Sequence, residues 1–212
     1  MSQRVGLVLA GGRSRRLGRA KGELLYRGQS LAERAANALW PLCSSVLISI
    51  GRGASNPAPG FATVEDAHSP GRGPLAGIAA GFSVTGDADL LILACDYPLV
   101  DTELLRRIAE APSPEDDVVI TSDCGGRDHP LVALWRRQAA ATVTDALAKE
   151  CLKVRALLAD LGVRRIGPEQ VHGVDLDRLL FNLNWPGELE ELSMRDTPPS
   201  PRGPEAIGES HE

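Results

Sequence analysis

This chain of 212 residues has few aromatic side chains and no long apolar run. Phe, Trp and Tyr make up only 4% of it, so Leu, Val, Ile and Ala must fill the interior. No stretch approaches the roughly 20 apolar residues that a membrane-spanning helix needs. The first apolar run is too short for a signal peptide and leads directly into glycines. We therefore expect no membrane association and no secretion.

Cysteine and histidine are too sparse and too scattered to build a metal centre. The four cysteines, Cys43, Cys95, Cys124 and Cys151, contain no C-x-x-C pair, which argues against a zinc knuckle. Cys43 and Cys95 lie in apolar surroundings and are expected to be small core residues, which fits a reducing, cytoplasmic location. The four histidines are dispersed, which argues against a histidine-based metal site.

The common glycine fingerprints of nucleotide-binding folds are also missing. A P-loop does not fit, because the interval from Gly12 to Gly18 is too long and no Gly-Lys-Ser/Thr follows. The dinucleotide pattern G-x-G-x-x-G is absent, although the stretch from Gly71 to Gly77 comes within one residue of it. The isoelectric point near 5.5 argues against general nucleic-acid binding, which favours a basic face.

The most informative feature that is present is an apolar run that opens into a basic glycine loop. Residues 5–9 are typical of a buried strand and lead into Ala10-Gly11-Gly12. Five cations follow without an acid, at Arg13, Arg15, Arg16, Arg19 and Lys21, although the net charge is -5. Glycines let backbone N–H groups turn toward an anion, and Arg and Lys neutralise phosphate oxygens. The segment predicts a polyphosphate site; a solvated flexible loop is the alternative.

Alternating strand and helix patterns predict an α/β fold with three layers and a doubly wound, mostly parallel sheet. The expected strands are 5–9, 46–50, 61–64, 90–94, 118–121, 129–135 and 163–166. The expected helices are 31–40, 74–82, 102–110, 136–148, 153–161 and 188–192, with Ser30 and Asp101 capping two of them. Proline-rich residues 193–212 are expected to form a disordered tail.

Two acids follow expected strands at the edge where such sheets bind ligands, beyond the carboxyl ends of the strands. Asp96 comes after the apolar run 90–94, and Asp66 follows the short strand 61–64. Magnesium favours one or two carboxylates with water and phosphate oxygens, so Asp96 is a candidate Mg²⁺ ligand; a turn-forming or capping role is the alternative. Asp66 is a candidate contact to ribose or base, or an ordinary loop acid.

Several motifs in order resemble nucleotidyltransferases of the molybdenum cofactor guanylyltransferase (MobA) type. They are Leu9-Ala10-Gly11-Gly12-x-Ser14-x-Arg16-x-Gly18-x-x-Lys21, Glu65-Asp66 before Gly73-Pro74-Leu75-Ala76-Gly77, Cys95-Asp96-Tyr97-Pro98, Arg127-Asp128-His129-Pro130, and Phe181-Asn182-Leu183-Asn184-x-Pro186. The likeness covers about residues 5–192. It implies a Rossmann-like nucleotidyltransferase fold in one domain, 1–192, with a nucleotide half at about 1–110 and a pterin half at about 111–192.

The resemblance also implies an activity and its residues. GMP would pass from GTP to molybdenum-molybdopterin, with release of pyrophosphate and with Mg²⁺ held by Asp96. The implied nucleotide contacts are Leu9, Ala10, Gly11, Gly12, Arg13, Lys21, Ser49, Asp66 and Asp96. Lys21, Asp96 and Arg16 would carry catalysis, and His129, Asn182 and Asn184 would contact the pterin. Expected partners, besides GTP and molybdopterin, are molybdopterin-synthesis proteins and acceptor molybdoenzymes.

Three residues depart from the family pattern, and other functions stay open. Ala20 stands where an acid commonly precedes the loop lysine, Ser49 where some members have Asn, and Trp185 where Thr is usual. The alternatives are a sister enzyme that uses CTP or a sugar phosphate, and a non-catalytic adaptor that binds nucleotide or cofactor. The second glycine, Gly12, favours the guanylyl branch by resemblance. Asn184 is equally a candidate N-cap for the last helix.

Overall fold

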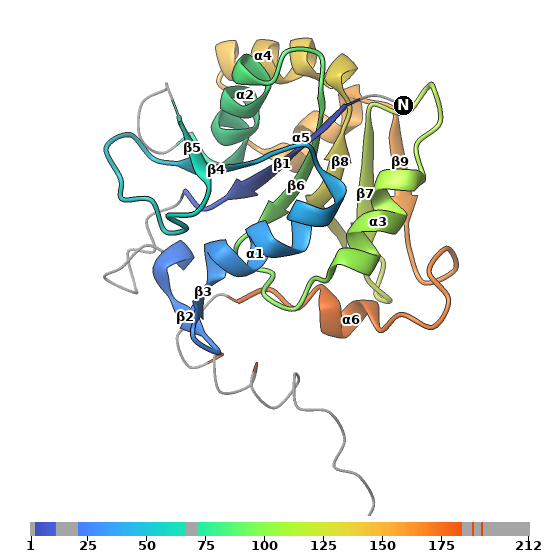
Figure 1. The fold of residues 1–212 in the computed structure, drawn as a ribbon. Coiled ribbons are helices and arrows are strands. Elements are labelled where there is room, and N and C mark those ends of the chain that lie inside the picture. The colour runs from blue at the N-terminus through green and yellow to red at the C-terminus, as the bar shows by residue number, and fades with distance from the viewer. Residues whose placement is uncertain (1–2, 12–20, 67–71, 184–187, 189–191, 193–212) are drawn as a thin grey trace, which may run out of the picture.

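A mixed β-sheet forms the centre of the computed structural model, which describes residues 3–11, 21–66, 72–183, 188 and 192 (Figure 1). Within these residues the sheet has seven strands in the order β5-β4-β1-β6-β8-β7-β9. Their bounds are Arg4–Leu9 (β1), Val46–Ile50 (β4), Ala62–Glu65 (β5), Asp89–Ala94 (β6), Val118–Ser122 (β7), Asp128–Trp135 (β8) and Val163–Ile166 (β9). A small separate sheet pairs Leu25–Tyr26 (β2) with Gln29–Ser30 (β3).

Most neighbouring strands run parallel, which confirms the expected fold class. β1 pairs in parallel with both β4 and β6, and β4 pairs in parallel with β5. β8 is the exception, because it runs antiparallel to both β6 and β7. Leu9 is in register with Ser49 on one side and Ala94 on the other, so the carboxyl ends of β1, β4 and β6 lie at the same edge.

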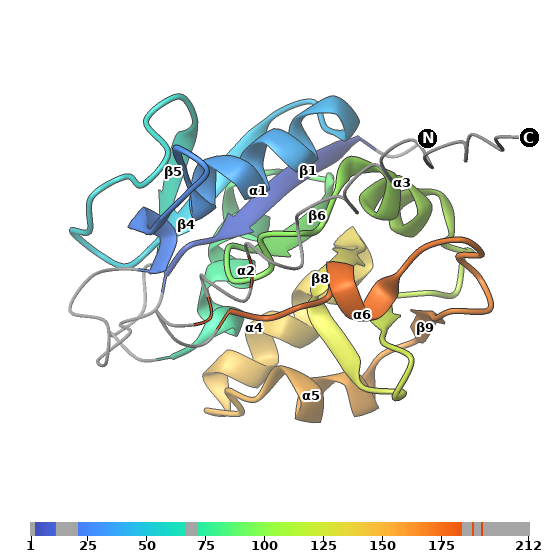
Figure 2. The same ribbon diagram turned by 90° about the horizontal axis from the view of Figure 1, so that it is seen from below.

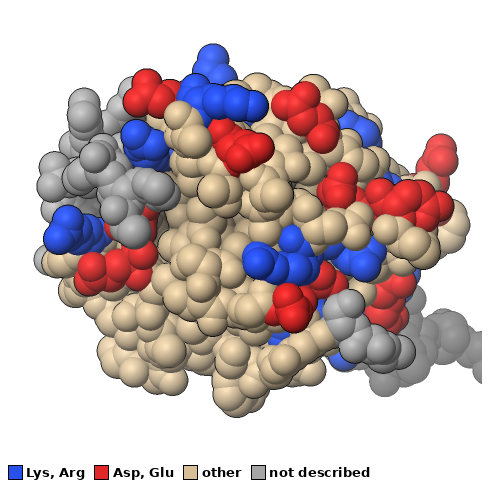
Figure 3. Space-filling model, turned by 90° about the horizontal axis from the view of Figure 1, so that it is seen from above, with Lys and Arg blue, Asp and Glu red and all other residues tan. Residues whose placement is uncertain are grey.

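Helices cover both faces of the sheet and complete a three-layer arrangement (Figures 1 and 2). The helices are Leu31–Leu39 (α1), Pro74–Val84 (α2), Thr102–Glu110 (α3), Ala140–Ala148 (α4), Val154–Leu157 (α5) and Leu176–Leu179 (α6). α2 and α4 pack together on one face, and α1 and α3 pack together on the other. The outer surface seen from above exposes acidic and basic side chains interspersed, as expected of solvated helix faces (Figure 3).

Two helices begin at the capping residues that the sequence indicates. Ser30 and Glu33 form a reciprocal capping box, in which the Ser30 hydroxyl accepts from the Glu33 N–H and the Ser30 N–H donates to the Glu33 carboxylate. The Asp101 carboxylate accepts from the Leu104 N–H at the start of α3. These side chains satisfy backbone donors that the first turn of a helix leaves without partners.

Two predicted helices are shorter than expected. The helix expected at 136–148 begins only at Ala140, after a 3-10 turn at Arg137–Ala139, because the extended Arg136 donates its N–H to the Asp117 carbonyl next to β7. The helix expected at 153–161 divides into α5 and a 3-10 turn at Leu158–Asp160. The helix expected at 188–192 and the tail expected at 193–212 lie outside the described residues, apart from residues 188 and 192.

The cysteines behave as core or surface residues without a bond between them. All four thiols are free; Cys95 is buried and Cys43 is partly exposed against the core. Burial raises the pKa of Cys95 to about 12 and that of Cys43 to about 11, so neither thiol is a nucleophile at neutral pH. Among the described residues, no helix is long and apolar enough to cross a bilayer.

Candidate functional site

The carboxyl ends of three strands bring the predicted nucleotide residues to one edge of the sheet. The Ala10 N–H donates to the Ser49 carbonyl (3.0 Å), so the chain that leaves β1 lies beside the end of β4. A Cβ added at Gly11 would lie 3.6 Å from the backbone nitrogen of Gly51, so the first glycine of the loop runs beside the backbone that follows β4. The Asp66 N–H donates to the Ile50 carbonyl (3.1 Å), which sets Asp66 on the same edge.

Lys21 and Asp96 meet at this edge. The Lys21 ammonium lies 3.7 Å from the Asp96 carboxylate and donates a hydrogen bond of 2.7 Å to the Leu183 carbonyl. The Leu183 N–H in turn donates to the Asp96 backbone carbonyl (2.8 Å). Leu183 therefore contacts both groups, and residues 181–183 are called the site strap below. The sequence expectation that Lys21 and Asp96 converge agrees with this geometry.

The Asp96 carboxylate has the environment of a cation ligand. Its side chain is 23% exposed, yet Oδ1 is buried and has no hydrogen-bond partner among the described residues. Burial raises the pKa of Asp96 above its ordinary value, and the charge of Lys21 only partly offsets this. A buried acceptor oxygen without a partner is costly, and a bound cation would satisfy it.

The donor set near Asp96 suits magnesium better than a transition metal. The described residues contain no group of three or more His, Cys, Asp and Glu side chains that could hold a metal ion. Magnesium takes one or two carboxylates and completes its shell with water and phosphate oxygens, whereas zinc requires three or four protein ligands. The surroundings of Asp96 therefore fit Mg²⁺, if the edge binds phosphate as the sequence predicts.

Helix α2 packs directly on the strand ends that carry the site. A Cβ on Gly77 would meet the Ser49 hydroxyl at 2.5 Å and a Leu9 methyl at 2.9 Å, so only glycine allows this approach. Gly73 has a φ of +68° at the N-cap of α2, followed by Pro74 in the first turn. Ser49 is only 4% exposed beneath this helix, and its contact to a nucleotide stays a prediction.

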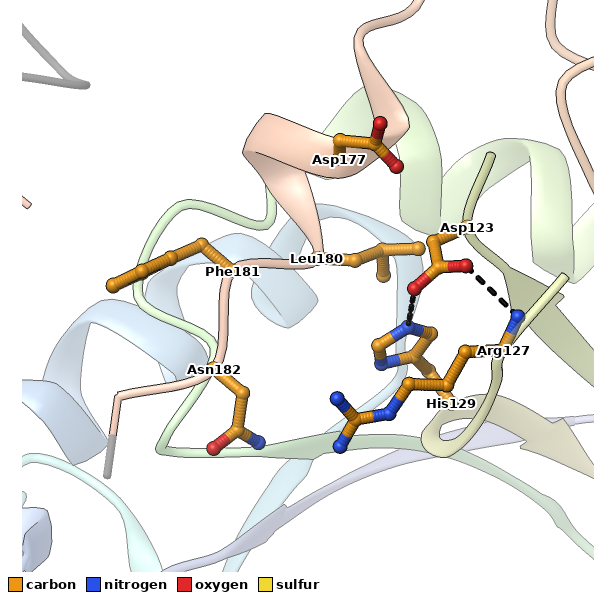
Figure 4. A pocket seen from close by; sticks show the side chains of 7 residues that line it. All are labelled: Asp123, Arg127, His129, Asp177, Leu180, Phe181 and Asn182. Carbon is orange, nitrogen blue, oxygen red and sulfur yellow. Dashed lines mark hydrogen bonds and ion pairs between the residues drawn. The ribbon is translucent and has the colours of Figure 1, made fainter. Parts of the chain in front are cut away.

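A cavity of about 320 Å³ opens beside the site strap (Figure 4). Its lining residues are Asp123, Arg127, His129, Asp177, Leu180, Phe181 and Asn182. Two of them, His129 and Asn182, were predicted from the sequence as pterin contacts. Arg127 and Phe181 lay within motifs of the resemblance without an assigned role, and nothing in the sequence singled out Asp123, Asp177 or Leu180. All seven come from the second half of the chain.

His129 lies at the base of this cavity with both ring nitrogens engaged. Nε2 lies 3.1 Å from the Asp123 carboxylate, and Nδ1 lies 3.2 Å from the Tyr97 hydroxyl. The two rings meet edge to face, with centroids 5.6 Å apart. Burial lowers the pKa of His129 below its usual 6.5, the Asp123 carboxylate opposes that shift, and Arg127 and Arg155 add to it. Burial therefore favours the neutral form of the imidazole.

Several expected residues fall outside the part of the chain that the structure describes. They are Gly12, Arg13, Arg16 and Asn184, together with the departures Ala20 and Trp185. The described residues at this edge of the sheet that are predicted to contact the nucleotide are Leu9, Ala10, Gly11, Lys21, Ser49, Asp66 and Asp96. This edge adjoins the cavity that is lined in part by His129 and Asn182, two of the predicted pterin contacts.

Comparisons with known proteins agree with this geometry. The model of the family described as "MobA-like NTP transferase domain" matches residues 6–166. A probable molybdenum cofactor guanylyltransferase of Chloroflexus aggregans is 33% identical over 190 residues, which cover 87% of this chain and 91% of that protein. The molybdenum cofactor guanylyltransferase of Pseudomonas putida is 32% identical over 191 residues, which cover 87% and 95%.

Solved structures show the same fold. The molybdopterin-guanine dinucleotide biosynthesis protein A of Archaeoglobus fulgidus superposes with a TM-score of 0.73 at 24% identity, covering 90% of this chain and 97% of that one. The 2-C-methyl-D-erythritol 4-phosphate cytidylyltransferase of Thermus thermophilus superposes with a TM-score of 0.66 at 17% identity, covering 93% and 100%. At these identities the likeness concerns the fold alone.

Proposed function

This chain belongs to the family of MobA-like NTP transferases, and from that premise we propose that it transfers GMP from GTP to molybdenum-molybdopterin and releases pyrophosphate. The support is twofold: curated relatives with that activity in their names align over nearly the whole chain, and Lys21 meets Asp96 at the strand ends. The second observation carries the chemical argument, because the reaction needs a cation and a metal ligand on one polyphosphate.

The proposed reaction requires positioning and charge rather than a covalent nucleophile. An ionised terminal phosphate of the pterin attacks the α-phosphorus of GTP, the bond to the bridging oxygen breaks, and pyrophosphate leaves with that electron pair. The Lys21 ammonium neutralises the charge that develops on the departing pyrophosphate. Because the attacking phosphate is already ionised, His129 need not act as a base.

Asp96 would hold Mg²⁺, which supplies positive charge to the phosphate oxygens when it is bound. At the end of β1 the side chains of Leu9 and Ala10 are buried and Gly11 has none, so we propose that a phosphate approaches the backbone there. Asp66 is proposed to contact the ribose or base, and Ser49 the nucleotide at the end of β4. Arg13, Arg16 and Gly12 complete the proposed set by sequence alone.

The cavity beside the site strap is the proposed seat of the pterin. Its lining residue Asn182 precedes Leu183, whose N–H donates to the Asp96 carbonyl, and the lining mixes the polar side chains of His129 and Arg127 with the ring of Phe181. A pterin offers an aromatic face and several amide-like donors and acceptors, which suits such a lining. We accordingly propose a nucleotide half at about 1–110 and a pterin half at about 111–192 within one domain. The cytoplasm is the proposed location, with molybdopterin-synthesis proteins and acceptor molybdoenzymes as partners.

The experiment compares GTP, CTP and ATP in two assays on the same preparation. Thermal unfolding with and without Mg²⁺ reports binding, because a ligand that binds only the folded state raises its stability. Pyrophosphate release with molybdenum-molybdopterin reports transfer. We expect both signals with GTP and Mg²⁺ only. Equal or stronger signals with CTP would assign a sister nucleotidyltransferase, and GTP binding without pyrophosphate would assign an adaptor.

The variant Lys21→Met tests the chemical role of the ammonium. We expect kcat at saturating GTP to fall about 10²–10³-fold, the scale for loss of a fixed electrostatic donor. The matched control is Lys149→Met, because Lys149 is exposed at the end of α4 and is not among the residues that line the cavity. Near-normal turnover of Lys21→Met, with Lys149→Met unchanged, would remove Lys21 from the mechanism.

A further inference from the structure

The starting point is an arginine of helix α1 that the proposed reaction does not use. The Arg34 guanidinium donates two hydrogen bonds to the Pro98 carbonyl, from Nη2 (3.2 Å) and from Nε (3.4 Å). Pro98 is buried, and among the described residues its carbonyl accepts from no other group. A buried carbonyl is costly without a partner, so the turn around Pro98 depends on Arg34 for its conformation.

The turn that Arg34 holds carries the proposed metal ligand. Asp96 lies two residues before Pro98 and next to Tyr97, which is buried. The Tyr97 N–H donates to the Ala94 carbonyl (3.2 Å), which joins the turn to the end of β6. The Asp96 carboxylate has no side-chain lever of its own length to correct an error in the backbone, because aspartate is short. A change in the turn would therefore move the carboxylate.

The same helix also holds the segment that carries Lys21. The Leu24 N–H donates to the Lys21 carbonyl (3.1 Å), and the Leu31 N–H at the start of α1 donates to the Leu24 carbonyl (2.9 Å). Arg34 follows Leu31 within one helical turn. The first turn of α1 is therefore bound both to the segment of Lys21 and to the turn of Asp96.

The Tyr26 ring fixes the guanidinium in place. Arg34 Cζ lies 4.9 Å from the centroid of this ring, and Tyr26 is only 4% exposed. Tyr26 belongs to the hairpin of β2 and β3, which lies against α1 (Figure 1). A guanidinium is planar and forked, so it can stack on a ring while two of its N–H groups donate to a carbonyl. An ammonium lacks this shape and cannot make both contacts in the same way.

We propose that Arg34 is a positioning residue, which sets the place of the Asp96 carboxylate relative to the Lys21 ammonium. This inference rests on the proposed function, in which Asp96 holds Mg²⁺ and Lys21 neutralises the departing pyrophosphate. Both groups must contact one triphosphate, and they lie 3.7 Å apart in the structure. Groups behind a metal ligand commonly orient it and raise its affinity for the metal, and Arg34 does so through the backbone of the turn.

A direct effect of the Arg34 charge on the metal would have the opposite sign from positioning. If the guanidinium acted only as a nearby positive charge, its removal would strengthen Mg²⁺ binding, because like charges repel. If Arg34 positions Asp96, its removal weakens Mg²⁺ binding. A role in stability alone would lower the unfolding temperature and leave the Mg²⁺ requirement unchanged. The direction of the change in Mg²⁺ requirement therefore separates the three roles.

Three variants change Arg34 or its support one at a time. Arg34→Met removes the charge and both donors but keeps an unbranched side chain, whereas Arg34→Lys keeps the charge and loses the planar fork. Tyr26→Leu removes the ring and leaves Arg34 in the chain. The matched control is Arg106→Met, because Arg106 is exposed on α3, where it pairs with Glu103 at the surface.

The first measurement is the Mg²⁺ concentration that produces half of the GTP-dependent thermal shift of the full-length protein. We expect Arg34→Met to need about tenfold more Mg²⁺ than the wild type, the lower end of the range for loss of a group behind a metal ligand. Arg34→Lys and Tyr26→Leu should lie between these two, and Arg106→Met should match the wild type. An unchanged or lower Mg²⁺ requirement in Arg34→Met would overturn the positioning role.

The second measurement is amide hydrogen exchange without nucleotide or Mg²⁺, which tests the structural step by itself. The Tyr97 N–H is bound to the Ala94 carbonyl, and the Leu183 N–H is bound to the Asp96 carbonyl (2.8 Å). We expect both amides to exchange about tenfold faster or more in Arg34→Met, because a buried carbonyl has lost its partner, and to stay unchanged in the matched control. Wild-type exchange of both amides would show that the turn does not depend on Arg34. Arg34→Lys supplies the same comparison if Arg34→Met does not fold.

Pyrophosphate release separates a failure of this inference from a failure of the proposed function. At saturating Mg²⁺ we expect Arg34→Met to lower kcat about tenfold, with a smaller change in KM for GTP. If the wild type released no pyrophosphate, the proposed function would fail, while the Mg²⁺ requirement and the amide exchange would still decide the role of Arg34. If the wild type were active and Arg34→Met kept its Mg²⁺ requirement, the inference alone would fail.

Discussion

The close approach of α2 to the strand ends makes Gly77 the position where one added methyl should matter most. In Gly77→Ala, the new Cβ would lie 2.5 Å from the Ser49 hydroxyl and 2.9 Å from a Leu9 methyl. Real Cβ atoms essentially never come that close, and Ser49 is too deeply buried to swing into solvent. The helix must therefore move away from β1 and β4, or both strand ends must shift.

Two opposing effects set the magnitude. Alanine stabilises a helix interior by about 1 kcal/mol relative to glycine. Overpacking a core costs about 1–3 kcal/mol, and a contact at 2.5 Å against a fixed group belongs to the upper part of that range. We expect the clash to win, with a net loss of about 1–2 kcal/mol in the free energy of unfolding.

Urea unfolding measures this balance in four variants, which are Gly77→Ala, Gly60→Ala, Ser49→Ala and the double variant Ser49→Ala/Gly77→Ala. Gly60 has open space around its Cβ position, so Gly60→Ala should leave the stability nearly unchanged. In a Ser49→Ala background the shortest contact is absent, and the cost of Gly77→Ala should fall by at least half. A Gly77→Ala protein as stable as the wild type would show that α2 does not sit on the strand ends as described.

Two further predictions concern a helix cap and an acid. Ser30→Ala removes the oxygen that accepts from the Glu33 N–H and should lower stability by about 1 kcal/mol in urea unfolding, whereas an unchanged midpoint would contradict the cap. Burial opposes ionisation of Asp116, but hydrogen bonds from Ser113 and Arg164 outweigh it and hold its pKa below the usual 3.8. The contribution of the ionised Asp116 carboxylate to the free energy of unfolding is therefore present above pH 3.8. It is lost as the pH falls through the lower pKa that Asp116 has in the folded state. Asp116→Asn should cost about 1–3 kcal/mol at pH 7, and thermal unfolding across pH 2–7 should show that difference vanish in acid; a constant difference would refute the assignment.

Local chemistry predicted the parts of the fold that depend on neighbours in sequence. Ser30 and Asp101 begin α1 and α3 as expected, because a cap needs only its own first turn. The apolar runs 5–9 and 90–94 became most of β1 and β6, since strands buried on both faces are largely apolar. The edge that gathers Asp66 and Asp96 followed from the rule for parallel strands.

Strand direction and short elements were harder to predict. A strand such as β8 has the same composition whichever way it runs, so its composition does not predict its direction. The signal that could have predicted it is the link from β7 that contains Gly125 and Gly126, because this link is too short for a parallel crossover. The hairpin of β2 and β3 turns at Arg27 and Gly28, both with positive φ, but two-residue strands show no periodicity.

The contacts of His129 were beyond sequence reasoning for a different reason. Tyr97, Asp123 and His129 lie on separate segments, and no spacing rule connects them. Their relation depends on the antiparallel course of β8, which brings His129 against Tyr97. The motifs marked His129 and Asn182 individually, whereas the contacts of His129 with Asp123 and Tyr97 exist only in three dimensions.

The bond from Lys21 to the Leu183 carbonyl spans 162 positions of the chain, and this separation has a consequence for biosynthesis. A ribosome exposes the lysine early and the carbonyl only when the last part of the domain emerges. A nascent chain can pair β1 with β4 long before then, but its ammonium has no carbonyl to hold it. The position of the lysine proposed to bind the triphosphate is therefore fixed late in translation, and a product cut short before Leu183 would lack the carbonyl that holds the Lys21 ammonium.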